Sequence, residues 1–124
     1  MSQWANFKLE EFNCKYSGEN KVEHELIDKL QLVRDELGFP LVVSSGYRSA
    51  DHPAEKSKSK PGTHNQGIAV DIAISHEKAY KLIASAIKHG FTGIGVKQKG
   101  GGRFIHLDIS EGDESRPRPH IWSY

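Results

Sequence analysis

Cysteine is nearly absent from this sequence, and long apolar runs are absent altogether. Cys14 is the single cysteine among 124 residues, so an internal disulfide and a cysteine-rich zinc knuckle are both excluded. No run approaches the roughly 18 apolar residues that a membrane span requires. Residues 1–8 lack the uninterrupted apolar stretch of a signal peptide, so we expect cytoplasmic synthesis without one.

An excess of charge of either sign is also missing. The 17 Lys and Arg residues nearly balance the 16 Asp and Glu residues, giving a formal net charge of +1. A dedicated nucleic-acid-binding protein would carry a strong basic excess, so we expect no nucleic-acid partner. The length fits one domain with one core, and we expect residues 1–124 to form a single domain that acts as a monomer.

The hydrophobic pattern predicts two main helices and several short strands. Helical spacing of apolar residues covers 20–38, with Asn20 and Glu23 resembling a capping box, and recurs from Ser75 to Gly90. A polar loop of about two dozen residues, 44–67, is long enough to suggest function. The tail, 111–124, we expect to be extended at best. Strands are predicted at 41–43, 68–74, 91–96 and 103–109, which together indicate a small α+β domain with a mostly antiparallel sheet.

Polar side chains interrupt two of these apolar strands. Asp71 alternates with Val70 and Ile72, and His106 and Asp108 share one face of the strand 103–109. Burying such groups without compensation costs several kcal/mol, and a zinc ion held by two histidines and a carboxylate would supply the compensation. The residues alone equally allow another interpretation, in which His64 caps a turn, Asp71 pairs with a lysine and His106 is a hydrogen-bonded core histidine.

Three blocks of sequence carry a resemblance to a known family. Ser45–Ser49 (SGYRS), Gly62–Ile72 (GTHNQGIAVDI) and Phe104–Asp108 (FIHLD) are similar to the motifs of the zinc D-Ala-D-Ala carboxypeptidases and L-alanyl-D-glutamate endopeptidases, which share the hedgehog-like fold. The resemblance implies a zinc-dependent peptidase whose partner is the peptidoglycan stem peptide. It leaves open whether the cut is that of a carboxypeptidase or an endopeptidase.

The resemblance also implies roles for individual residues. His64, Asp71 and His106 match the three zinc ligands, and Arg48 matches the arginine that engages the substrate. The planar, permanently charged guanidinium suits a carbonyl or carboxylate better than lysine would. The alternative for Arg48 is a structural ion pair with Asp51 or Glu55.

One position departs from the family pattern. Many relatives carry a carboxylate, which serves as general base, about three residues before the last histidine ligand; here that residue is Arg103. Asp108 and His120 are the substitutes we expect to move the proton, although Asp108 can equally orient an imidazole and His120 can be a surface residue. The missing carboxylate also favours an alternative function, a zinc-containing module that binds cell wall or protein without turnover.

The same features suggest where the protein works. A compact domain without a signal peptide suits a phage lysin or a virion-associated enzyme that acts on the bacterial cell wall, and a bacterial cytoplasmic protein is the alternative. Trp122 and Tyr124 either pack over the domain or line its cleft, and their sequence context does not distinguish these placements.

Overall fold

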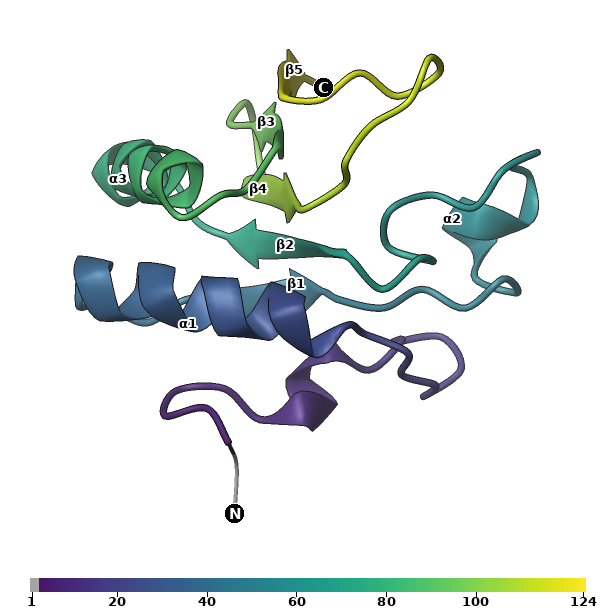
Figure 1. The fold of residues 1–124 in the computed structure, drawn as a ribbon, viewed down its shortest axis with the longest axis horizontal. Coiled ribbons are helices and arrows are strands. Elements are labelled where there is room, and N and C mark those ends of the chain that lie inside the picture. The colour runs from purple at the N-terminus through teal and green to yellow at the C-terminus, as the bar shows by residue number, and fades with distance from the viewer. Residues whose placement is uncertain (1–2) are drawn as a thin grey trace.

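The computed structural model describes residues 3–124, which form one five-stranded sheet with helices packed against it (Figure 1). The two long helices are α1 and α3, as the sequence predicts, and α2 is a single turn within the long polar loop. The elements in chain order are η1 (Leu9–Phe12), α1 (His24–Leu37), β1 (Val42–Ser45), α2 (Pro53–Lys56), β2 (Ala69–Ala73), α3 (His76–Lys88), β3 (Gly93–Lys97), β4 (Phe104–Asp108) and β5 (His120–Ser123).

The strands follow the spatial order β1-β2-β4-β3-β5. Three of the four strand pairs are antiparallel, and β5 runs parallel to β3 at the edge of the sheet. The predicted α+β class with a mostly antiparallel sheet is therefore confirmed. The tail differs from the expectation, because backbone pairing along β3 converts its last residues into a fifth strand.

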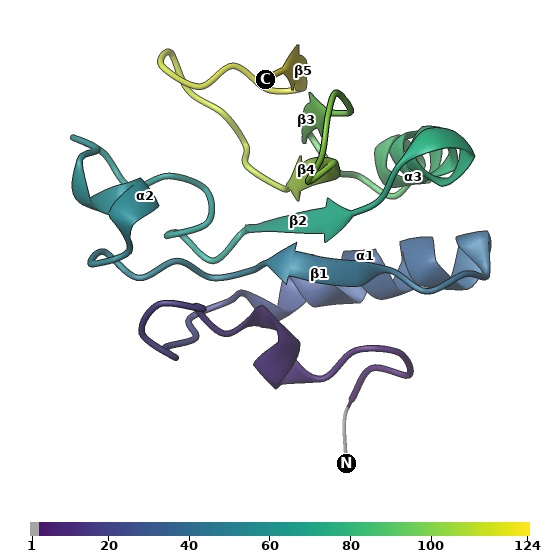
Figure 2. The same ribbon diagram turned by 180° about the vertical axis from the view of Figure 1, so that it is seen from behind.

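The core lies between one face of the sheet and the two long helices. In Figure 1 α1 lies in front of β1 and in Figure 2 it lies behind, so this helix covers one face. Leu26, Ile27 and Leu30 of α1 and Leu82 of α3 are fully buried there, as the helical spacing predicts. The start of α1 differs slightly from the prediction. Glu23 is its N-cap, while the side chain of Asn20 accepts a hydrogen bond from Val22 N in the turn before it.

The long polar loop is ordered by its own hydrogen bonds. His52 Nδ1 accepts from Ala54 N and so caps α2, and Asn65 Nδ2 donates to the carbonyl of Arg48. The backbone N–H of Arg48 donates in turn to the carbonyl of His64. These contacts hold the segment around Arg48 beside the segment that carries His64, which leads directly into β2.

The sheet face away from the helices carries the polar residues. Val70 and Ile72 of β2 and Ile105 and Leu107 of β4 point into the core, which leaves the alternate positions on the opposite face.

None of the helices in residues 3–124 has the length and apolar content that crossing a bilayer requires.

Candidate metal centre

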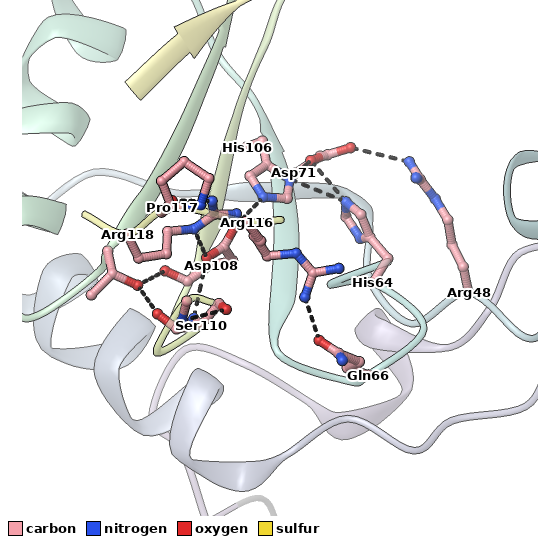
Figure 3. A network of polar contacts seen from close by, with 12 residues as sticks. Arg48, His64, Gln66, Asp71, His106, Asp108, Ser110, Arg116, Pro117 and Arg118 are labelled. Atoms are coloured by element: carbon pink, nitrogen blue, oxygen red, sulfur yellow. Dashed lines mark hydrogen bonds and ion pairs between the residues drawn. The ribbon is translucent and has the colours of Figure 1, made fainter. Parts of the chain in front are cut away.

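Three buried side chains converge on the polar face of the sheet. His64 Nε2 lies 3.2 Å from Asp71 Oδ1, His106 Nδ1 lies 3.1 Å from the same oxygen, and the two nitrogens are 3.3 Å apart. All three residues are at most 5% exposed. Figure 3 shows the two imidazole rings and the carboxylate pointing toward one another. The residues matched to zinc ligands by resemblance are thus brought together in space.

Local structure explains this convergence. Asp71 and His106 are direct cross-strand partners on β2 and β4, so their side chains leave the same face at neighbouring positions. His64 comes from the end of the polar loop, where its Nδ1 contacts the carbonyl of Gly46 at 2.8 Å. Because a carbonyl only accepts, Nδ1 donates in this contact, and the ring is turned so that Nε2 faces Asp71.

His106 is oriented in the same way from its other side. Its Nε2 donates to Asp108 Oδ2 at 2.7 Å, which leaves Nδ1 directed at the other two ligand atoms. Each ring therefore has its outer nitrogen engaged by a protein oxygen and its inner nitrogen directed at the point where the three ligand atoms converge. This is the second-sphere arrangement that metal-binding histidines ordinarily have.

The electrostatics of the cluster favour a charged carboxylate. Burial alone would raise the pKa of Asp71, but hydrogen bonds from His106 and His64 and the charge of both rings hold that pKa well below its usual range. Burial likewise opposes charge on His106, yet Asp108 and Asp71 outweigh it and raise the pKa of the imidazole. Without a metal ion, the cluster thus attracts a proton to the place where a cation would lie.

The geometry also fits zinc. In a tetrahedral site with bonds of about 2.0–2.1 Å, neighbouring ligand atoms are roughly 3.3 Å apart. The three distances here, 3.1 to 3.3 Å, match that edge length. Two imidazoles and one carboxylate are a donor set that zinc prefers, and three protein ligands leave a fourth position open for a water or a substrate, as catalytic zinc sites do.

Asp108 lies behind His106, away from the open side of the cluster. It is fully buried, and Arg118 clamps both of its oxygens, with Nε donating to Oδ1 at 3.0 Å and Nη2 to Oδ2 at 2.8 Å. A Cβ on Gly93 would lie 2.3 Å from the Asp108 carboxylate, so the missing side chain on β3 makes room for this pair. Burial opposes ionisation, but His106 and Arg118 hold the pKa of Asp108 well below its usual range. Of the two roles expected for Asp108, this geometry favours orienting the imidazole.

A cavity of about 340 Å³ opens over the three ligands. Arg48 reaches into it, with Nη2 3.3 Å from Asp71 Oδ2 and Nε donating to Ser45 Oγ at 3.2 Å. Its partner is therefore the cluster itself, whereas the alternative expected Asp51 or Glu55. The lining residues are Arg48, Lys58, Gly62, Thr63, His64, Asp71, Phe104, His106, Arg116, Arg118, Trp122 and Tyr124.

Two residues expected to move protons do not line this cavity. Asp108 is enclosed as described above, and His120 is exposed on β5, where its ring stacks on Trp122 with centroids 5.8 Å apart. Arg103 lies elsewhere as well, bonded to Gly100 O and His76 Nε2. Asp71 is the only carboxylate among the lining residues of this cavity.

The C-terminal tail supplies Arg116 and Arg118, two cavity-lining residues that sequence reasoning missed. Trp122 and Tyr124 take one of the two placements considered for them, because both line the cavity, and the ring of Trp122 lies 5.2 Å from that of His106. The ring of Trp122 occupies space that a Cβ on Gly95 would fill, at 2.7 Å from its Nε1. Two sequence signals were available: the alternation of glycine with Ile94 and Val96 in β3, and the two-residue spacing of aromatic rings over 120–124.

A small α+β domain with two histidines, one carboxylate and an open cavity above them has the architecture of a metal-dependent hydrolase. The peptidase M15 family matches residues 5–108, and the chain belongs to that family. Its members are metal-dependent peptidases that act on peptidoglycan peptides. No curated protein matches the sequence. The matched range ends at Asp108, so the tail that completes the cavity lies outside it.

Proposed function

We propose that this protein is a zinc peptidase that hydrolyses peptide bonds in peptidoglycan stem peptides. The observation that carries the proposal is the set of three ligand atoms, 3.1 to 3.3 Å apart, at the base of an open cavity. Membership of the M15 family supports the peptidase chemistry. We further propose that the protein works as a monomer on the bacterial cell wall, in the setting of a phage lysin.

The residues divide the work by position. His64, Asp71 and His106 would hold the ion, and Zn²⁺ bound there would activate a water molecule and polarise the scissile carbonyl. Arg48 lies beside Asp71 with its guanidinium in the cavity, where it can donate hydrogen bonds to a substrate carbonyl or carboxylate. Asp108, clamped by Arg118, holds His106 in the tautomer that presents Nδ1.

A second candidate function is a zinc-containing module that binds cell-wall peptide without cleaving it. The observation that favours it is the absence of any carboxylate except Asp71 among the residues lining the cavity. A peptidase needs a group that accepts the proton of the attacking water, and a carboxylate commonly does so. Binding needs only the cavity and its positive charges.

Metal content and peptidoglycan digestion, measured together, distinguish the two functions. We expect one zinc per chain and release of new amino termini or free D-alanine, lost on chelation and restored by zinc. His64→Ala and His106→Ala are expected to lose both zinc and cleavage, whereas His24→Ala, an exposed histidine on α1, keeps both. Mass spectrometry of the fragments identifies the bond.

Two results would contradict the zinc peptidase. Cleavage by metal-free protein would refute the zinc peptidase. Bound zinc with saturable peptidoglycan binding and no new termini would instead support the binding module.

A further inference from the structure

Four basic side chains line the cavity over the candidate metal cluster: Arg48, Lys58, Arg116 and Arg118. Three of them are paired with carboxylates of the protein. Arg48 pairs with Asp71 at 3.3 Å, Lys58 with Glu55 at 2.7 Å and Arg118 with Asp108 at 2.8 Å. These three charges are therefore largely neutralised before any substrate arrives.

Arg116 is held differently. Its Nη1 donates to Gln66 Oε1 at 2.9 Å (Figure 3). Its Nη2 donates to the carbonyl of Pro61, also at 2.9 Å, and both acceptors are neutral. Within residues 3–124 no carboxylate forms an ion pair with its guanidinium. Only two of its N–H groups are used by these contacts, so the others are free to donate to a ligand.

The backbone around Arg116 is fixed by a tight turn. Asp113 Oδ1 accepts hydrogen bonds from Arg116 N at 2.9 Å and from Ser115 N at 2.8 Å, and the backbones of Asp113 and Arg116 form a bridge. The carboxylate of Asp113 is thus used on the backbone of the turn. The guanidinium is tied at the same time to the loop that carries His64, so it is positioned in advance and loses little freedom on binding.

We propose that Arg116 is a specificity-determining residue that binds a free carboxylate of the peptide substrate. This inference rests on the proposed function and extends it to the class of peptide that is accepted. An uncompensated guanidinium with free, forked N–H donors matches a carboxylate in charge and in geometry. Because Arg116 lies in the tail beyond the family match, the selectivity belongs to this chain's own C-terminal segment.

A lysine-containing stem peptide offers two sources of such a carboxylate: its C-terminus and the free α-carboxylate of the γ-linked D-glutamate. The experiment uses the pentapeptide L-Ala-γ-D-Glu-L-Lys-D-Ala-D-Ala and two analogues, each amidated at one of these carboxylates. Binding to metal-free protein is measured by calorimetry, and kcat/KM is measured on the zinc-loaded protein. We expect amidation of one of the two groups to weaken binding by roughly 10- to 100-fold, the range of a hydrogen-bonded charge pair, and that analogue identifies the source.

Variants then assign the effect to Arg116. Arg116→Gln is expected to bind the parent peptide as weakly as the wild type binds the critical amide, with no further loss on amidation. Arg116→Lys keeps the charge without the fork and is expected to retain part of the discrimination, which covers the case in which the glutamine variant folds poorly. Arg103→Gln, outside the cavity, is the matched control and is expected to discriminate like the wild type.

Two results would overturn the assignment: equal binding of all three peptides by the wild type, or undiminished discrimination by both Arg116 variants. These failures are separate from failure of the proposed function. Discrimination without cleavage would support Arg116 and refute the peptidase, whereas cleavage without discrimination would do the reverse.

Discussion

At the scale of single residues, Asp108 is placed to support the candidate metal cluster without lining the cavity above it. Its oxygens accept from His106 Nε2, from Nε and Nη2 of Arg118 and from the backbone N–H of Ser110, which saturates the carboxylate in a fully buried position. Its contacts with the cavity pass through His106 and Arg118, and Asp108 itself does not line the cavity. It can keep the adjacent imidazole in one tautomer and one orientation.

Asp108→Asn separates these two roles. The amide keeps the shape but loses the negative charge that His106 and Arg118 share, so we expect zinc affinity to fall by about 10- to 100-fold. Competition with a chromophoric chelator measures this directly. Unchanged zinc affinity together with lost turnover would instead show that Asp108 moves the proton. Arg118→Lys, which retains the charge but not the fork, provides a milder variant for the same comparison.

At the scale of elements, two glycines of β3 leave the space that neighbouring side chains of the site occupy. Gly93 and Gly95 lie on the polar face, next to Asp108 and Trp122, while Ile94 of the same strand packs in the core. This alternation lets one strand close the core on one side and admit the Arg118–Asp108 pair on the other.

Gly93→Ala tests that arrangement. Its Cβ would meet the buried Asp108 carboxylate at 2.3 Å, and overpacking of this kind costs about 1–3 kcal/mol in the free energy of unfolding. Gly101→Ala is the matched control, because its Cβ would meet nothing within 4 Å. We expect denaturant melts to show destabilisation for Gly93→Ala alone. Equal stability of the two variants would contradict the close packing at β3.

The contact between α1 and α3 gives a second prediction, on pH. Glu36 of α1 accepts from Lys88 and, at 2.6 Å, from Ser85 Oγ of α3, and these bonds lower its pKa to about 2 from a usual 4.5. Because the folded-state pKa is depressed, the stabilisation is complete above pH 4.5 and disappears as the pH falls toward 2. Glu36→Gln should therefore melt below the wild type near pH 6 and converge with it in acid. Glu114→Gln, at an exposed tail position outside the ion pairs found in residues 3–124, should match the wild type at every pH.

The sequence predicts some elements better than others, for physical reasons. Strands β2 and β4 are predicted because alternation with a half-buried face is a local signal. Strand β5 is missed because it is short, exposed and stabilised by parallel pairing with β3, whose paired residues lie 27 positions earlier (93 against 120), and no local pattern records this. The same distinction applies to the site. His64, Asp71 and His106 lie in recognisable motifs, whereas Arg116 and Arg118 join it only through the path of the tail.

At the scale of the whole molecule, the candidate metal cluster joins segments that are distant in the chain. The polar loop, β2 and β4 each supply one ligand, so an ion bound to all three would bind the folded state far better than the unfolded chain. Ligand binding of this kind adds stability that grows with the free concentration of the ligand, by about 2.7 kcal/mol at one hundred times the dissociation constant. Zinc should therefore act on the stability of the entire domain as well as on its chemistry.

We expect zinc to raise the melting temperature of the wild type by several degrees at neutral pH and to leave His64→Ala unchanged. The rise should shrink as the pH falls, because Asp71 and Asp108 raise the pKa of His106 in the metal-free protein and a proton there competes with the ion. Scanning calorimetry with and without zinc, from pH 8 to pH 5, measures both effects. His24→Ala, an exposed histidine on α1, is the control and should follow the wild type throughout. A zinc-induced rise that persists in His64→Ala would place the ion elsewhere, and one that does not change with pH would exclude His106 as a ligand.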